Sequence, residues 1–202
     1  MAGSLGRLNE AINLVRKAVA ANPLDGYNYN NLSRLLSGAG QLKDAEQAAR
    51  RAVSLDPMTA NFHAWLAAVN VLLHHSSLAL SEADAEPAAG MRAWALTLAY
   101  TASGKRTQAD RAMKTLIDGY SGNAAYQIAE AYAYRRQPDK VFVWLDRAWR
   151  QRDPGIGFLV YDPFLHRYRN DPRFAAFCKK VGLPVPNQDN AVSSDLMKGP
   201  QP

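Results

Sequence analysis

The chain has 202 residues, of which 48% are apolar and 21% are charged, and its formal net charge is +6. This balance is typical of a folded globular protein and excludes a chain too polar to form a core. Cys178 is the only cysteine, which excludes an internal disulfide framework, and no apolar run reaches the roughly eighteen residues of a membrane-spanning helix. We therefore expect a cytoplasmic protein without a membrane segment.

The first residues predict one helix over 5–21. Apolar residues recur there at three- and four-residue spacing, from Leu8 through Ile12 to Val19. We interpret residues 1–4 as a start-site or expression remnant. The helix matches the second half of the two-helix unit that follows it, so the chain begins in the middle of a repeat. The alternative is that this helix is a native cap.

Residues 27–57 predict a pair of antiparallel helices. The first carries an apolar face of leucines, and the second carries a stripe of mostly small residues that lets two helices approach closely. These residues are Leu32, Leu35 and Leu36, then Ala45, Ala48, Ala49, Ala52 and Val53. Between the helices, the breaker Gly-Ala-Gly-Gln at 38–41 supplies a position with positive φ, and Asp56-Pro57 ends the second helix.

This unit recurs with a fixed period, which predicts a solenoid of stacked helix pairs. Gly6, Ala11, Ala18 and Pro23 recur 34 residues later as Gly40, Ala45, Ala52 and Pro57. The order of residue types resembles the tetratricopeptide repeat (TPR), whose signature is met by Tyr29, Leu32, Ser33 and Leu36, then by Ala45, Ala49, Ala52 and Pro57. The resemblance implies an all-α fold, a right-handed superhelical TPR solenoid of antiparallel helix pairs.

Three further units follow at unequal offsets. Leu66 lies 34 residues after Leu32, Leu96 lies 30 after Leu66, and Ile128 lies 32 after Leu96. The third unit is therefore shorter than the second by about one helical turn. We place a half-repeat at 5–24 and full repeats at about 25–58, 59–89, 90–121 and 122–152.

The pattern changes after Arg152. Asp162-Pro163 and Asp171-Pro172 each resemble an N-cap followed by proline at the first helical position, and they predict a short helix near 163–169 and a longer one at 172–181. We expect 153–183 to form a C-terminal cap on the last repeat. The polar, proline-rich composition of 184–202 predicts a disordered tail.

A more specific resemblance covers residues 126–183. The residues that carry it are Ala129, Tyr132, Trp144, Leu145, Ala148, Asp153-Pro154-Gly155, Asp162-Pro163 and Asp171-Pro172-Arg173-Phe174. This run is similar to the C-terminal repeat region of bacterial signalling proteins, in which such repeats follow a winged-helix DNA-binding domain, a nucleotide cyclase or a protein kinase. The resemblance implies a sensing or interaction region of a larger protein and assigns no catalytic residue to this segment.

Motifs for catalysis, metals or cofactors are missing from the sequence. His74 and His75 are adjacent, so on a helix they point about 100° apart and do not form the i, i+4 pair of a helical metal site. Glu82, Asp84 and Glu86 alternate, and we expect them to form a solvated edge. Phosphate-loop and nucleophile motifs are also absent. We therefore expect no enzymatic activity, no metal and no cofactor. Because the basic residues are dispersed, we also expect no direct nucleic-acid binding by this region.

The first helices of the stacked units predict a concave groove. Aromatic residues with polar neighbours are typical of peptide-binding hot spots, so we expect a protein or peptide ligand there. The candidate groove residues are Tyr27, Asn30, Arg34, Asn61, Trp94, Thr101, Tyr126, Glu130 and Tyr134. Trp94 and Tyr126 have packing between helices as an equal alternative, and Arg34 and Tyr134 are expected to be replaceable without loss of stability. The alternative function is a structural oligomerisation module, a homodimer formed through residues 5–21.

Overall fold

The computed structural model describes residues 7–185, so the expected remnant at 1–4 and residues 186–202 of the expected tail lie outside the described residues. Within this range the chain is all-helical, and no helix is both long and apolar enough to cross a bilayer. The α-helices are α1 (Leu8–Ala21), α2 (Gly26–Gly38), α3 (Leu42–Leu55), α4 (Phe62–Leu72), α5 (Ser76–Ala85), α6 (Ala89–Ala102), α7 (Arg106–Tyr120), α8 (Ala125–Tyr134), α9 (Pro138–Arg150) and α10 (Pro172–Lys180). Two 3-10 helices, η1 (Pro154–Tyr161) and η2 (His166–Tyr168), lie between α9 and α10.

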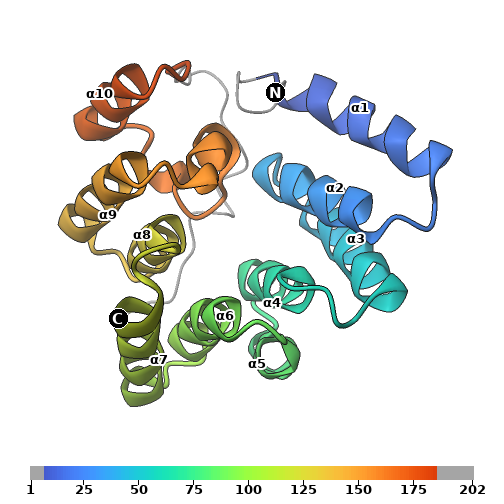
Figure 1. The fold of residues 1–202 in the computed structure, drawn as a ribbon, viewed down its shortest axis with the longest axis horizontal. Helices are drawn as coiled ribbons and strands as arrows, with labels where there is room; N and C mark the ends of the chain where they lie inside the picture. The colour runs from blue at the N-terminus through green and yellow to red at the C-terminus, as the bar shows by residue number, and fades with distance from the viewer. Residues whose placement is uncertain (1–6, 186–202) are drawn as a thin grey trace.

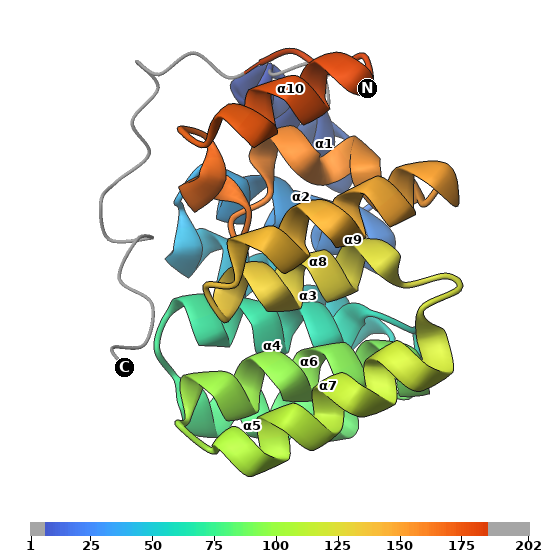
Figure 2. The ribbon, with the colours of Figure 1, turned by 90° about the vertical axis from the view of Figure 1, so that its left-hand side faces the viewer.

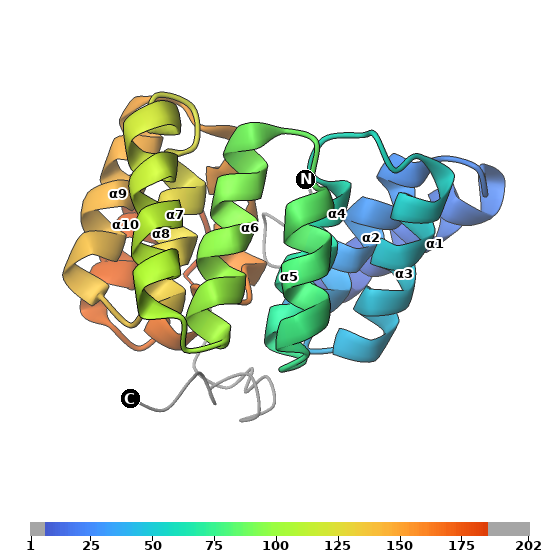
Figure 3. The same cartoon turned by 90° about the horizontal axis from the view of Figure 1, so that it is seen from below.

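The helices form two layers that curve around a central space (Figure 1). The first helix of each repeat, α2, α4, α6 and α8, lies on the inside, and its partner, α3, α5, α7 or α9, lies on the outside. Consecutive helices from α4 to α7 lie side by side, as the view from below shows (Figure 3). This is the antiparallel helix-pair solenoid that the sequence period predicts.

Each inner helix ends in the same hydrogen-bonded turn. A residue with positive φ follows α2, α4, α6 and α8, and the next N–H donates to the carbonyl five residues back at 2.8 to 3.0 Å. The residues with positive φ are Gly40, His74, Gly104 and Arg136. Gly40 confirms the breaker expected at 38–41. His74 and Arg136 adopt the same conformation, although positive φ costs a non-glycine residue about 1 kcal/mol. The turn offsets this cost because it satisfies the last carbonyls of the helix.

Small residues set the distance between the two layers. Ala45, Ala49 and Ala52 of α3 are fully buried against α2. Bulk comes instead from the inner helices, where Trp65 and Leu66 of α4 are 1% exposed. The expected division between a small-residue outer helix and a bulky inner helix is therefore confirmed for this pair of repeats.

The C-terminal segment does more than cover the last repeat. Helix α10 packs against α9 (Figures 1 and 2), and its expected range, 172–181, agrees with the observed Pro172–Lys180. Residues 154–168, which we call the insert, turn into the concave side between α8 and α2. A Cβ added at Gly38 of α2 would lie 2.1 Å from the backbone oxygen of Tyr161, so the insert meets α2 at its backbone.

We predict that Gly38→Ala destabilises the protein although alanine is the better helix former. The added methyl group forces α2 and the insert apart, and such overpacking costs about 1–3 kcal/mol of unfolding free energy. The matched control is Gly119→Ala in α7, where an added Cβ meets nothing within 4 Å. That variant is expected to gain about 0.5–1 kcal/mol. Chemical denaturation followed by circular dichroism measures both, and equal effects of the two substitutions would contradict the contact with the insert.

Candidate functional site

The nine candidate groove residues separate into two groups. Tyr27, Asn30, Arg34 and Asn61 line a cavity of about 600 Å³ at one end of the central space. The remaining five, Trp94, Thr101, Tyr126, Glu130 and Tyr134, are not among the residues that line it. Trp94, Tyr126, Glu130 and Tyr134 are at most 5% exposed. For these four side chains, the expectation of contact with a ligand in an open groove does not match the structure.

The insert is the physical reason for this burial. The ring of Phe164 makes edge contacts with Trp94 and Tyr134, at centroid distances of 6.3 and 5.8 Å. Tyr134 packs under the insert and is not exposed, so the basis for the expected tolerance is wrong, and we expect its replacement by alanine to remove buried contacts. For Trp94 and Tyr126, the packing alternative is the correct one, although the packing partner is the insert as well as a neighbouring helix.

Tyr126 and Glu130 of α8 form a polar cluster with Asp162 of the insert. The hydroxyl of Tyr126 donates to Asp162 Oδ2 at 2.9 Å, while Asp162 Oδ1 accepts the N–H groups of Phe164 and Leu165. Burial, with the neighbouring Asp162 carboxylate and the hydrogen bond to it, raises the pKa of Glu130 well above its usual range. The raised pKa favours the protonated form of Glu130, whose carboxyl group can then donate a hydrogen bond to Asp162.

Arg34 lies between two aromatic rings on the cavity side of this cluster. Its guanidinium carbon is 4.3 Å from the centroid of Trp65 and 4.1 Å from that of Phe158 in η1. Trp65 is fixed in turn by a hydrogen bond to Ser33 Oγ at 3.1 Å and by stacking on Trp94. Arg34 thus joins α2 to the insert, which explains its 8% exposure. We therefore expect its replacement to lower stability, because the expected tolerance assumed an exposed side chain.

Two carboxylates cap inner helices from a distance in sequence. Asp153 accepts the N–H of Tyr126 at the start of α8 and the N–H of Gly155 in η1. Glu86 accepts the N–H groups of Asn61 and Ala64 around the start of α4. Glu86 is fully buried, so the expected solvated edge is wrong at this residue. The sequence signal was present, because Glu86 lies shortly before α6 and Asp153 lies immediately before η1, but the N–H groups that they accept from α4 and α8 lie 22 to 27 residues earlier.

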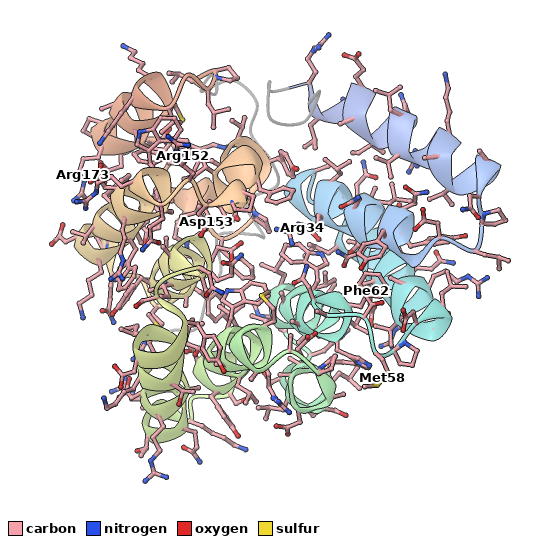
Figure 4. All side chains as sticks on the ribbon, in the orientation of Figure 1. Arg34, Met58, Phe62, Arg152, Asp153 and Arg173 are labelled. Carbon is pink, nitrogen blue, oxygen red and sulfur yellow. The ribbon has the colours of Figure 1, made fainter. Side chains whose placement is uncertain are left out.

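The cavity opens where the inner helices begin. Its wall is contributed by the first turns of α2, α4, α6 and α8 and by η1, with aromatic and apolar residues beside the polar ones. Besides the four candidate residues, the lining comprises Asn31, Ala60, Phe62, Ala88 to Met91, Tyr120, Asn123, Ala124, Gln127, Asp153, Pro154, Gly155 and Phe158. Arg34 and Asp153 lie on opposite sides of the central space, from α2 and from the α9–η1 connection (Figure 4).

Other reactive side chains serve packing. Cys178 is fully buried, and burial raises its pKa to about 11. His63 Nδ1 lies 2.7 Å from Glu82 Oε2 and links α4 to α5. Burial lowers the pKa of His166 to about 4, so this imidazole is neutral at physiological pH.

Comparison with known proteins agrees with the repeat architecture. The family model described as tetratricopeptide repeat matches residues 27–57. No curated protein sequence matches the chain. Among solved structures, MamA is similar with a TM-score of 0.51 and 20% identity, over 73% of this chain and 90% of that one. A tetratricopeptide repeat protein from Parabacteroides merdae is similar with a TM-score of 0.55 and 12% identity, over 95% of this chain and 77% of that one. The chain carries a tetratricopeptide repeat, and its fold is that of a TPR solenoid.

We predict that Glu130→Gln changes how stability depends on pH. Because the folded state raises the pKa of Glu130, its contribution to stability is complete below the unfolded pKa near 4.5 and is lost as the pH rises through the folded pKa. Glutamine preserves a donor to Asp162 and does not titrate. Relative to the parent, the variant should therefore gain stability as the pH rises, measured by denaturation from pH 5 upward. A constant difference at every pH would contradict a proton held on Glu130. Glu10→Gln, on exposed α1, controls for loss of one carboxylate.

Proposed function

We propose that the protein is a non-enzymatic scaffold that binds a protein or peptide at the cavity between the first turns of its inner helices. The observation that carries the proposal is the cavity itself, which combines aromatic walls with side chains able to hydrogen-bond and has a volume in the range of ligand pockets. The exposed rim of the cavity includes Tyr27, which is 64% exposed and packs edge-on against Phe62 at 5.2 Å. Exposed tyrosines of this kind are frequent anchors in protein interfaces.

The proposal includes a place for this scaffold in a larger assembly. The resemblance of residues 126–183 to the C-terminal repeats of bacterial signalling proteins supports a sensing or interaction region that acts on an output domain. The segment that carries this resemblance includes the insert. Asp153, just before the insert, accepts the N–H of Gly155, and Asp162, within it, accepts the N–H of Leu165. In this proposal, a ligand in the cavity contacts η1 directly and is therefore coupled to the segment that joins the two ends of the solenoid. The proposed location is the cytoplasm.

A second candidate function, homodimerisation through α1, has its own supporting observation. The main packing partner of helix α1 is helix α2. Its residue Leu14 is 52% exposed, and Leu8, Val15 and Val19 are only partly buried. Leu8, Val15 and Val19 pack against the core on one side of α1, and Leu14 lies away from that side. In this proposal, a second copy of the chain covers Leu14 and the apolar surface that the core leaves exposed.

For the first function, we predict that peptides selected by display on the whole chain bind at the rim of the cavity. Tyr27→Ala should weaken them by at least about tenfold, as expected for an aromatic hot spot, while folding is preserved because the side chain is exposed. Fluorescence anisotropy with labelled peptides measures the affinity. The control, Arg50→Glu, changes an exposed residue of the outer helix α3. If the selected peptides tolerate Tyr27→Ala and are lost with Arg50→Glu, the binding surface lies on the outer helices. If the selection yields no peptide, the function itself is wrong.

For the second function, we predict that light scattering coupled to size-exclusion chromatography detects a dimer whose fraction rises with concentration. Leu14→Glu should return the chain to a monomer, because a charge placed in an apolar contact is left without its water. Val143→Glu provides the control, since Val143 is 63% exposed on α9. A monomer at every concentration would exclude the dimer.

A further inference from the structure

Side-chain amides surround the cavity on several walls. The amide of an asparagine or glutamine carries two N–H donors and an acceptor oxygen, so it can bind a group that both donates and accepts hydrogen bonds. Helix α2 contributes two of these amides, the residue before α4 one, the connection between α7 and α8 one, and α8 one. The five residues are Asn30, Asn31, Asn61, Asn123 and Gln127.

The fold does not use these amides. Within residues 7–185, no hydrogen bond connects any of the five side chains to another residue. Asn30 is 6% exposed, and its Oδ1, like that of Asn61, is buried without a partner. A buried acceptor without a donor destabilises the fold, so its presence at the cavity points to a ligand. Because the terminal torsion of asparagine is broad and roughly two-fold, either end of the amide can turn toward the cavity.

The two charged residues of the cavity wall, Arg34 and Asp153, already serve the fold. The charge of Arg34 opposes the rise in the pKa of Glu130 and of Tyr126, and aromatic rings cover both faces of its guanidinium. Asp153 Oδ2 accepts the N–H of Tyr126, and Oδ1 accepts the N–H of Gly155. An ion that entered the cavity would exchange its water for neutral amides, at a cost in free energy. The cavity therefore favours a neutral ligand.

Aromatic rings form the apolar part of the same walls. Tyr27 and Phe62 meet edge to face with ring centroids 5.2 Å apart. Tyr120, at the end of α7, and Phe158, in η1, add two more rings to the lining. A Cβ added at Gly90 would lie 2.9 Å from the ring of Tyr120, so the start of α6 packs closely against this ring. Such rings can cover an apolar face of a ligand while the neighbouring amides bind its polar edge.

The insert makes the cavity compact. Beyond Arg34, the central space is filled by Trp65, Trp94 and Tyr126, which are at most 1% exposed. A chain lying along the whole concave face has no free path there. An extended peptide also spreads its N–H and C=O groups along its length, whereas the five amides surround one closed space. The cavity therefore fits a compact ligand whose donors and acceptors surround an apolar face.

We propose that this cavity binds a neutral saccharide, with its hydroxyl groups hydrogen-bonded to the amides and the C–H face of a sugar ring against the aromatic wall. A hydroxyl group both donates and accepts, and it therefore matches an amide, which does the same. The inference rests on the proposed function, because it uses the same cavity, and it specifies the group of the partner that enters. Two sources share this chemistry: a glycan attached to a partner protein or peptide, and a free saccharide.

The test applies the labelled full chain to an array of neutral saccharides of glucose, galactose, mannose and N-acetylglucosamine, beside saccharides that contain uronic or sialic acid. We expect a neutral saccharide to bind best. Isothermal titration calorimetry then compares that saccharide with its O-methylated form, which should bind at least about tenfold more weakly because its hydroxyl donors are removed. A serine peptide that carries the same saccharide identifies the source. Equal affinity assigns the saccharide alone, and tighter binding of the glycopeptide assigns a glycosylated partner.

Two variants locate the saccharide. Asn30→Leu replaces a buried amide without a partner by an apolar group of similar size, so it should weaken binding by about three- to tenfold and leave the melting temperature unchanged or higher. A residue with only a structural role would not combine these two effects. Gln127→Ala, at a half-buried position of the lining, should weaken binding by a similar factor. The control is Gln47→Ala, which removes an exposed amide from the outer helix α3 and should change neither binding nor stability.

Several results would overturn the proposal. If the acidic saccharides bind best, charge governs the cavity and the ligand is not neutral. If the O-methylated form binds as tightly as the parent saccharide, the amides do not read hydroxyl groups. If Gln127→Ala and Gln47→Ala have equal effects, the saccharide lies outside the cavity. If no saccharide on the array binds, the inference fails, whereas the proposed function fails only when display selection also yields no peptide.

Discussion

The placement of Arg34 between Trp65 and Phe158 is the interaction on which the rest of the concave side depends. A guanidinium between two rings gains about 2 kcal/mol or more when water is excluded, and here it connects the second helix of the chain to a segment more than a hundred residues later. The stack continues through Trp94 to Phe164, so the two ends of the solenoid share one aromatic core. A solenoid held only by contacts between neighbouring repeats has no comparable closure.

This closure requires buried polar groups, and the structure satisfies most of them in pairs. Asp162 accepts the Tyr126 hydroxyl and two backbone N–H groups, and burial next to Asp162 raises the pKa of Glu130. Burial penalises an ionised carboxylate, and a second carboxylate nearby adds repulsion, so the geometry explains the direction in which the pKa of Glu130 moves. Arg34 lowers the electrostatic cost from the other side, since its charge opposes the rise in the pKa of Glu130.

The insert also decides what kind of site remains. By filling the middle of the concave face, it converts an extended groove into a cavity at one end, next to the first turns of the inner helices. Carboxylates serve the starts of all four inner helices, because Asp25 caps α2, Glu86 accepts N–H groups at the starts of α4 and α6, and Asp153 accepts an N–H at the start of α8. The proposed site therefore depends on how the insert folds as much as on the repeats.

The sequence by itself determined the helix pairs, the period and the turns, because these depend on contacts within about 34 residues. Leu32 and Ala45 mark facing helix surfaces, and Gly40 marks the turn between them. Only the tertiary structure decided which candidate groove residues remain accessible. Burial of Trp94 and Tyr134 depends on Phe164, and the state of Glu130 depends on Asp162, so neither follows from the pattern of its own helix. The repeat period specifies which side of a helix faces inward, but contacts distant in sequence determine whether another segment covers that side.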